Sequence, residues 1–561
     1  MTVPAQKSPA LVWVAILAAL TFELQGLVRR DPVLSRDDEA LIRPLQRAHG
    51  LADYVAGVRG GQVLDLQPVR DASLWGDLAL HRLTGVSTFH LTNLALLLVL
   101  LVLLQRLLAA RWGPTWAVAA VVALYAFHPV VANTVSWIAA RKHLLSAVFI
   151  LAATVVATRK DKPLGPGRQL AAVALYTLSV LSQPITLLWP AWLALELWLQ
   201  TRNLKSLAPL LVPLAGVALV VGGVNVWYYR TIFVSLAHGS KFVEAPEGTI
   251  AVSLLAIGRY LFNCILPVAV ATTYDPGRWF NLVGLCLLPL LAFVSLKLGR
   301  TADVVSGWGM FLFPLIPVTA RMTNIFVSDT YLLVPLAGLG MVGLAVWDAV
   351  GNSRGRAAVA GVAAALAAVA FIMQSHVVAA SWSSEAALWD HAYHTEPTPN
   401  ALAKQSFYLL GAGRLDESLQ VAEQLLEWEP HHPEAAYVFA HAVAESRSLT
   451  PREKLARLDA SPAHDAWTDY FGAVVAAKAG DYGAALARVA QAADGASRFG
   501  GQAAVVAAEA EFFCRKAGRS DCEALVAKYE QSAGAAWEPM KYAGRRRSLG
   551  LAETQNPIGS P

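Results

Sequence analysis

Apolar and polar stretches alternate along the chain up to about residue 380. A helix that spans a bilayer needs about 20 predominantly apolar residues, and twelve stretches approach that length, although the one at 169–182 is short for a full crossing. They occupy residues 10–28, 89–108, 115–131, 142–158, 169–182, 184–200, 207–227, 251–270, 279–297, 304–320, 330–348 and 357–379. The pattern predicts an all-α, polytopic membrane bundle over residues 1–380.

The positions of Lys and Arg predict how this bundle is oriented, because short basic loops stay cytoplasmic. Lys7 precedes the first run, and basic loops occur at 106–111, 159–168, 202–205, 297–300 and 354–356. The N-terminus is therefore expected to be cytoplasmic, with the long loop 29–88 outside. An odd number of crossings must separate 202–205 from 271–278, so either 207–227 or 251–270 does not cross. About eleven spans remain, which places the rest of the chain outside.

Residues 381–540 have the composition of a soluble domain and the pattern of paired helices. Gly413, Gly480 and Gly518 each separate two helical stretches, and the first two are 67 residues apart. That distance is close to two tetratricopeptide repeats of about 34 residues. We expect a tetratricopeptide-like α-solenoid whose concave surface binds a partner protein; a merely structural helical cap is the alternative. The basic, Gly- and Pro-containing segment 541–561 is expected to be a disordered tail.

Composition and cysteine usage narrow the function classes. The chain is 56% hydrophobic and 15% charged, with a net charge of +5 and no dense basic stripe, so nucleic acid is not an expected partner. Cys514 and Cys522 flank Gly518 and either form a disulfide, if that domain is outside the cell, or stay as thiols. No zinc or calcium ligand pattern is present, so no metal site is predicted and a divalent metal stays an open question.

Two adjacent carboxylates follow the first apolar run. Asp37 and Asp38 lie early in the expected outer loop. A carboxylate at a membrane surface can act as a general base toward an acceptor hydroxyl. The alternative is an ordinary solvated acidic start of a loop.

Three cationic residues begin the run after the second outer loop. Arg141, Lys142 and His143 lie on the outer side, against the general trend. Such a helix start favours an anion, for example a lipid phosphate, because the helix dipole adds to the side-chain charge; basic residues that reach phospholipid headgroups are the alternative. Asp329 and Tyr331 start the eleventh run, where a lone Asp is often a helix cap.

Several strings, in this order, resemble one family. They are DDEALI, LQPVRDASLWGDLALHRLTGVSTFHLTN, HPVVANTVSWIAARKHLLSAVF, LSQPITLLWPAWLALELW, GRYLFNCILPVAVATTYDP, SDTYLLVPLAG and SWSSEAALWDHAYHTEPTPNALAKQSFYLLGAGR. The chain is similar to bacterial membrane glycosyltransferases of the GT-C superfamily with C-terminal tetratricopeptide repeats. Their eukaryotic relatives are the transmembrane and tetratricopeptide-containing O-mannosyltransferases.

The resemblance implies transfer of a sugar from a polyprenyl-phosphate-type carrier to an acceptor, expected to be a protein, on the periplasmic face of a bacterial inner membrane. It implies inversion, with Asp37 or Asp38 as the base. Arg141 and Lys142, with His143, would hold the carrier phosphate. The remaining expected site residues would line the cavity: Asp329, Tyr331, Arg70, His90, Asn93 and His128. His90 and Asn93 fit interhelical hydrogen bonds equally well.

Three positions depart from the pattern of these relatives, and one of them is His143, which stands where they often carry an acidic residue or Asn. Gln183 stands where they commonly carry Lys, and Thr330 stands where they commonly carry Arg. The loss of two cations leaves open a catalytically silent scaffold that recruits envelope proteins through its repeats. A transporter or lipid flippase ranks last, because few charges lie in mid-span and no internal duplication is evident.

Overall fold

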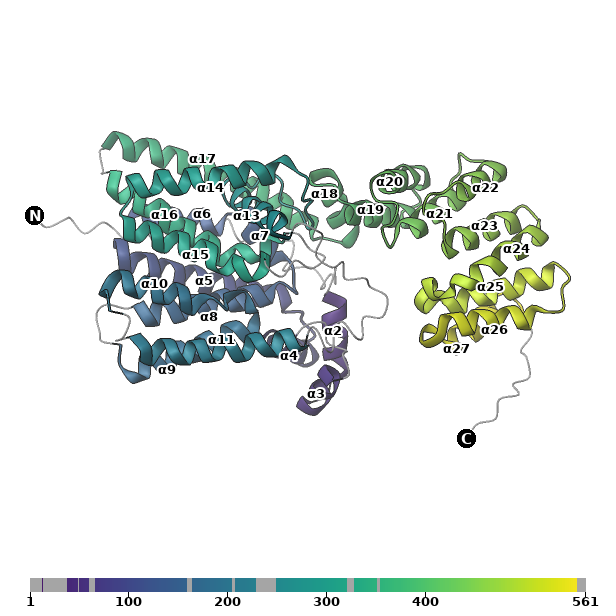
Figure 1. The fold of residues 1–561 in the computed structure, drawn as a ribbon, viewed down its shortest axis with the longest axis horizontal. Coiled ribbons are helices and arrows are strands. Elements are labelled where there is room, and N and C mark those ends of the chain that lie inside the picture. Colours follow the sequence, from purple (N-terminus) through teal and green to yellow (C-terminus); the bar gives the residue numbers. More distant parts are fainter. Residues whose placement is uncertain are drawn as a thin grey trace, which may run out of the picture. The chain divides into compact units, whose positions relative to one another are not determined.

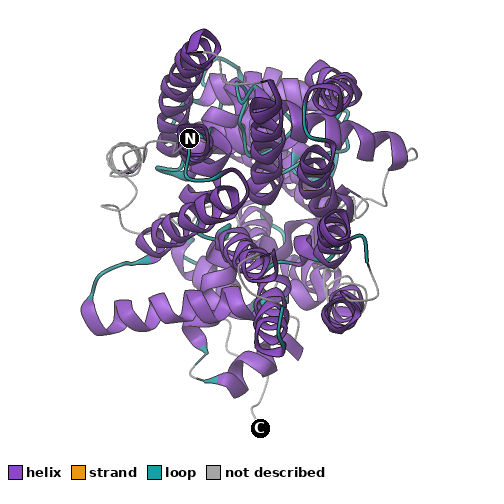
Figure 2. Ribbon diagram, turned by 90° about the vertical axis from the view of Figure 1, so that its left-hand side faces the viewer, coloured by secondary structure: helices purple, strands orange, loops and turns teal. Residues whose placement is uncertain are grey.

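The computed structural model describes residue 13 and residues 38–48, 50–59, 66–158, 164–203, 207–228, 249–319, 327–350 and 354–551. Every secondary-structure element in these residues is a helix (Figure 2), which confirms the expected all-α class. The chain forms two compact units, Met1–Glu396 and Pro397–Pro561. Asp37 lies outside the described residues.

Three helices of the expected outer loop precede the bundle of the first unit. They are α2 (Asp38–Arg47), α3 (Leu51–Arg59) and α4 (Pro68–Thr84). Ile42 and Leu45 of α2 pack with Leu74 and Leu78 of α4 in a small apolar core of their own. These helices lie at one end of the bundle (Figure 1). The loop is therefore helical where it is described, and its core fixes α2 on α4.

The bundle consists of the following helices, the long ones of which run between its two ends (Figure 1). They are α5 (Phe89–Trp112), α6 (Trp116–Ala126), α7 (Pro129–Ser136), α8 (Arg141–Thr158), α9 (Pro166–Ser182), η1 (Pro184–Thr186), α10 (Trp189–Thr201), α11 (Ala208–Tyr228), α13 (Thr249–Ile265), α14 (Trp279–Leu298), α15 (Thr301–Thr319), η4 (Asp329–Leu332), α16 (Leu333–Val350), α17 (Arg354–Ser381) and α18 (Glu385–Thr395). Within the described residues, seven helices are long and apolar enough to cross a membrane, and the pair α6 and α7, bent by 49°, raises this to eight. The chain is thus compatible with a multi-pass membrane protein.

Two pairs of helices approach so closely that only glycine fits between them. A Cβ on Gly284 of α14 would overlap the carbonyl oxygen of Gly258 in α13. A Cβ on Gly307 of α15 would lie 2.8 Å from the oxygen of Gly338 in α16. Small residues let helix backbones meet in this way in membrane bundles, where packing contacts replace the hydrophobic effect between helices.

The two ends of the bundle carry different polar groups. At one end, Arg111 near the end of α5 donates to Asp303 of α15 at 2.7 Å and to Glu196 of α10 at 3.0 Å. The opposite end holds the start of α5 and of α8. Helix α13 meets this opposite end twice, because Ser253 bonds to the carbonyl of Thr319 at 2.9 Å and Asn263 bonds to Asp329 at 2.7 Å.

The second unit is a series of packed helices. They are α19 (Pro399–Gly411), α20 (Leu415–Trp428), α21 (Ala435–Glu445), α22 (Pro451–Asp459), α23 (Ala466–Lys478), α24 (Tyr482–Ala492), η5 (Ala493–Gln502), α25 (Ala503–Lys516), α26 (Cys522–Ala533), η6 (Gly534–Ala536) and α27 (Pro539–Ser548). Gly413, Gly480 and Gly518 lie at turns between helices, as the sequence predicts, and each has a positive φ. Of the two alternatives for Cys514 and Cys522, the structure has the disulfide.

The last described residues differ from the disordered tail expected from residue 541. Residues 541–548 belong to α27, which packs on α25. Arg546 is buried and forms an ion pair with Glu511 at 2.7 Å, and Arg545 pairs with Glu509 at 2.5 Å. The arginines of this segment therefore form ion pairs with carboxylates of α25. Because those carboxylates lie more than thirty residues earlier in the sequence, the local sequence does not indicate that the segment is ordered. Residues 552–561 lie outside the described part of the chain.

Candidate functional site at one end of the bundle

Asp38 begins α2 and is held against the segment that leads into α8. Its side chain is 1% exposed, and its Oδ1 accepts a hydrogen bond from the backbone N–H of Ala139 at 2.7 Å. Ala139 lies two residues before Arg141, the first residue of α8. The structure therefore brings together the first acidic residue that it describes and the cationic helix start, which are about a hundred positions apart in the sequence.

Arg141 is fully buried and joins three helices. It forms an ion pair with Asp77 of α4 at 2.5 Å, and it donates to the Asn93 side chain at 2.8 Å and to the Phe89 carbonyl at 2.7 Å. A buried charge is costly unless it is paired and hydrogen-bonded. Asp77 meets this requirement, and no pattern in the sequence assigned it to the site.

Asp77 and Asn93 are themselves fixed by neighbours. Asp77 Oδ1 accepts from the hydroxyls of Thr88 at 2.8 Å and Thr92 at 2.7 Å, at the start of α5. Asn93 Nδ2 donates to the carbonyls of Val135 at 3.1 Å and Trp137 at 3.3 Å, around the end of α7. Asn93 is thus an interhelical link, which was one of the two interpretations of this residue.

His143 connects this cluster with η4. Its ring is buried and meets the ring of Tyr331 edge-on, with the centroids 4.9 Å apart. Lys142, between Arg141 and His143, is partly exposed. The cationic helix start and the Asp329–Tyr331 segment, predicted separately, are therefore neighbours.

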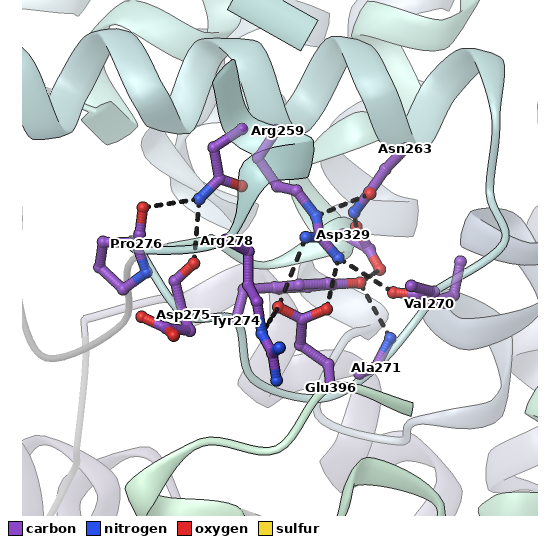
Figure 3. A network of polar contacts seen from close by, with 12 residues as sticks. Arg259, Asn263, Val270, Ala271, Tyr274, Asp275, Pro276, Arg278, Asp329 and Glu396 are labelled. Carbon is purple, nitrogen blue, oxygen red and sulfur yellow. Dashed lines mark hydrogen bonds and ion pairs between the residues drawn. The ribbon is translucent and has the colours of Figure 1, made fainter. Parts of the chain in front are cut away.

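A second polar cluster surrounds Asp329 (Figure 3). The carboxylate accepts from Asn263 of α13 at 2.7 Å and from the hydroxyl of Tyr274 in the loop before α14. Arg259 of α13 donates to Asn263 at 2.9 Å and pairs with Glu396 at 3.1 Å. Burial and the nearby Asp329 carboxylate raise the pKa of Tyr274 well above its usual value, so this phenol is a hydrogen-bond donor at neutral pH.

Arg70, at the start of α4, lies in a third cluster. It donates to Asp71 at 2.7 Å and to Gln67 Oε1 at 3.2 Å, while the Tyr54 hydroxyl donates to the other oxygen of Asp71 at 2.7 Å. Gln67 Nε2 donates to Gln183 Oε1 at 2.6 Å. Gln183 is therefore linked, through the side-chain amide of Gln67, to Arg70 at the start of α4.

His128 lies apart from these contacts, whereas His90 is close enough to Arg141 to interact with it electrostatically. His128 caps α7: its Nδ1 accepts from the N–H of Val130 at 3.3 Å, and its Nε2 bonds to the carbonyl of Cys264 at 3.1 Å. Since the carbonyl can only accept, the proton sits on Nε2 and the ring links two segments. His90 is half-buried beside Phe89 at the start of α5.

Two site residues that sequence reasoning missed had a detectable signal. Asp77 lies between leucines in LWGDLAL, and Arg259 lies inside the apolar run 251–270. An ionisable residue amid apolar neighbours in a membrane bundle usually has a partner in the protein interior. Glu396 carried no comparable signal, because it follows a helix of ordinary soluble composition.

Comparison with known proteins gives no family, since no family model, no curated protein and no solved structure matches this chain. Among the described residues, no group of three or more His, Cys, Asp and Glu side chains could hold a metal ion.

Proposed function

We propose that the protein is a membrane glycosyltransferase that moves a sugar from a polyprenyl-phosphate-type carrier to an acceptor at the outer face. The observation that carries the proposal is the contact between the Asp38 region and the start of α8. A buried carboxylate and a buried guanidinium lie near each other at one end of an apolar bundle, with only one residue between Arg141 and Ala139, whose backbone N–H binds Asp38. The lipid chain of a polyprenyl-phosphate donor lies in the bilayer, so its phosphate lies at the membrane surface, beside such an end of the bundle.

The reaction needs both groups. Asp38, or Asp37 beside it, takes the proton of the acceptor hydroxyl, and the acceptor oxygen forms a bond to the anomeric carbon. The bond between that carbon and the phosphate oxygen breaks, and its electron pair leaves with the phosphate, so the configuration inverts. Cations and a helix N-terminus stabilise the leaving phosphate; Arg141, Lys142 and His143 supply them, and Tyr331 lies against His143.

The proposed topology has eleven crossings, a cytoplasmic N-terminus and an outer second unit in the periplasm. Support comes from α13, which contacts the Asp38 end of the bundle near both of its own ends. Of the two runs between 202–205 and 271–278, 251–270 is then the one that does not cross, while the 21-residue α11 does. The seven long helices and the bent pair of α6 and α7 are eight of the proposed crossings, and the short helices α9 and α10 and the run 10–28 are the other three.

The second unit is proposed to be a tetratricopeptide-like solenoid that presents the acceptor. Its paired helices and glycine turns support this. The disulfide supports a location outside the cytoplasm, because reducing compartments keep such thiols apart.

A catalytically silent scaffold is the second candidate. It is favoured by the contacts of Arg141, which donates to an aspartate, an amide and a carbonyl within the protein. In that case the end cluster only holds helices together, and the second unit carries the function.

Single substitutions test the enzyme hypothesis. Membranes containing Asp37→Asn, Asp38→Asn or, as a matched control at the opposite end, Asp348→Asn are given a radiolabelled short-chain polyprenyl-phosphate hexose. We expect one of the first two changes to lower sugar transfer at least a hundredfold, a typical contribution of a general base, and the control to leave it unchanged. Transfer at the wild-type rate in both variants would remove the assigned base. The scaffold is favoured if the wild type consumes no donor and if truncation after Glu396 abolishes the recruitment of envelope proteins.

A further inference from the structure

A cavity of about 140 Å³ lies among α2, α3 and α4, next to the proposed base. One wall is apolar and consists of Leu41, Pro44 and Leu45 of α2. The remaining lining residues are mostly polar and come from all three helices: Arg47, Ala48, Asp53, Tyr54, Gly57, Arg70 and Asp71. Arg70 and Asp71 are at least nine-tenths buried and belong to the fixed interior of the unit, whereas Arg47 and Asp53 are exposed.

The cavity and Asp38 share one face of α2. Residues 38, 41 and 45 are three and four positions apart, which is the spacing of one helix face. Leu41 and Leu45 line the cavity, and Asp38 lies one turn earlier, about 5 Å along the axis. Ala139, which binds Asp38, belongs with Leu41 to one apolar core, and Ile138 belongs with Leu45 to another. A group in the cavity would therefore lie about one helix turn from Asp38, on the α2 face that also packs toward the start of α8.

Hydrogen bonds to residues outside the cavity fix the buried part of the polar wall. Arg70 donates to Asp71 and to Gln67, the Tyr54 hydroxyl donates to Asp71, and Gln67 is bound to Gln183 beyond the end of α9. These bonds tie α3 and α4 to the bundle. The positions of the guanidinium and the carboxylate are thus set before any ligand arrives, which is what a specific site needs.

We propose that this cavity binds a sugar residue of the acceptor and directs one of its hydroxyls toward Asp38. The proposal rests on the proposed function and names its acceptor class. A sugar ring offers several hydroxyls at once. They can bind the carboxylates of Asp53 and Asp71, the guanidinium of Arg70 and the phenol of Tyr54, while the ring packs on the apolar wall. A serine or threonine side chain has one hydroxyl and would use only one of these groups. The acceptor is then a glycan, whatever carries it.

The test compares two acceptors in the full-length protein. Purified protein in lipid nanodiscs receives the radiolabelled short-chain polyprenyl-phosphate hexose with methyl hexosides or with short Ser- and Thr-containing peptides. Free sugar released to water and sugar joined to the acceptor are measured separately. Ala48→Leu places three more carbon atoms at the cavity wall, and Ala56→Leu makes the same change on the exposed side of α3.

We expect the wild type to transfer to methyl hexosides in preference to the peptides. In Ala48→Leu the ratio of transfer to hydrolysis falls about tenfold, a difference of about 1.4 kcal/mol, and Ala56→Leu keeps the wild-type ratio. Tyr54→Phe removes one hydroxyl and leaves the ring in place, and we expect it to raise the half-saturating methyl hexoside concentration severalfold. This second variant tests the proposal even if Ala48→Leu does not fold. Transfer to the peptides alone, or a wild-type ratio in both cavity variants, overturns the acceptor proposal while donor consumption still supports the enzyme. No donor consumption by the wild type overturns the enzyme as well.

Discussion

At the scale of single residues, buried ion pairs hold together the helices at the end of the bundle where the candidate site lies. Arg141 with Asp77, and Arg259 with Glu396, are pairs in which all four side chains are almost inaccessible. Such a pair adds little net stability compared with apolar residues, but removing one partner leaves an uncompensated charge. The pairs therefore fix which helices meet, and a site built on them tolerates few substitutions.

Arg141→Gln is expected to destabilise the protein by about 3–5 kcal/mol, because Asp77 remains buried without its counter-ion. Adding Asp77→Asn removes that charge and should restore a large part of the stability. Thermal unfolding of the purified protein in detergent measures both effects. If Arg141 also binds the donor phosphate, the double variant regains stability without regaining sugar transfer; recovery of both together would make Arg141 a structural residue only.

Glu396→Gln tests the second pair, at the last residue of the first unit. The change keeps the shape of the side chain and removes the charge that faces Arg259. We expect a loss of about 3 kcal/mol in stability, with Glu427→Gln on the exposed surface of α20 as a control near zero. Equal melting temperatures for the two variants would contradict a role for this ion pair in holding α18.

At the scale of elements, backbone contacts decide where helices cross. Helix α13 meets α14 at Gly258 and Gly284, and no side chain separates them there. Hydropathy predicts such helices well, because a run of apolar residues is a local property. Their crossing points and ion pairs depend on residues far apart in the sequence, such as Arg111 and Asp303, so the local pattern predicted apolar helices but not their partners.

Gly284→Val should disrupt the crossing of α13 and α14, since the added carbons would occupy the position of the Gly258 carbonyl. We expect a loss of at least 1–3 kcal/mol, measured as a lower midpoint of unfolding in denaturing detergent. Gly216→Val in α11, where an added Cβ meets nothing within 4 Å, is the matched control. A similar loss in both variants would mean that the effect comes from valine in a helix and not from the crossing.

The second unit has its own cross-link between α25 and α26. The disulfide between Cys514 and Cys522 closes a short loop, and loop-closure entropy gives it about 2–3 kcal/mol. Cys522→Ser should lower the stability of the purified protein by that amount under oxidising conditions, and a reducing agent should lower the wild type to the same level. Wild type and variant that unfold identically without reductant would show that the disulfide does not form.

At the scale of the whole molecule, sequence and structure agree on class and differ in detail. The apolar runs predicted helices, and long apolar helices are what the described residues contain. Of the residues proposed for catalysis and donor binding, Asp38 was singled out as one of two adjacent carboxylates after the first apolar run, Arg141 by its position at a helix start, and both by resemblance. Their partners Ala139 and Asp77 were not, because a buried contact between distant segments has no periodic signature. The same reason explains why Arg545 and Arg546 looked like part of a disordered tail.

The orientation of the bundle decides whether the candidate site can work on a periplasmic acceptor, and it can be measured directly. Asp275 lies just before α14, and Asp348 lies near Arg300 just beyond the other end of α14, so about 30 Å of helix separates the two positions. In a Cys286→Ser background, Asp275→Cys should react with a membrane-impermeant maleimide in spheroplasts, and Asp348→Cys should react only after the membrane is opened. The reverse pattern would place Asp38, Arg141 and the site between them in the cytoplasm, where a base and cations at this end could not serve an outer-face transfer.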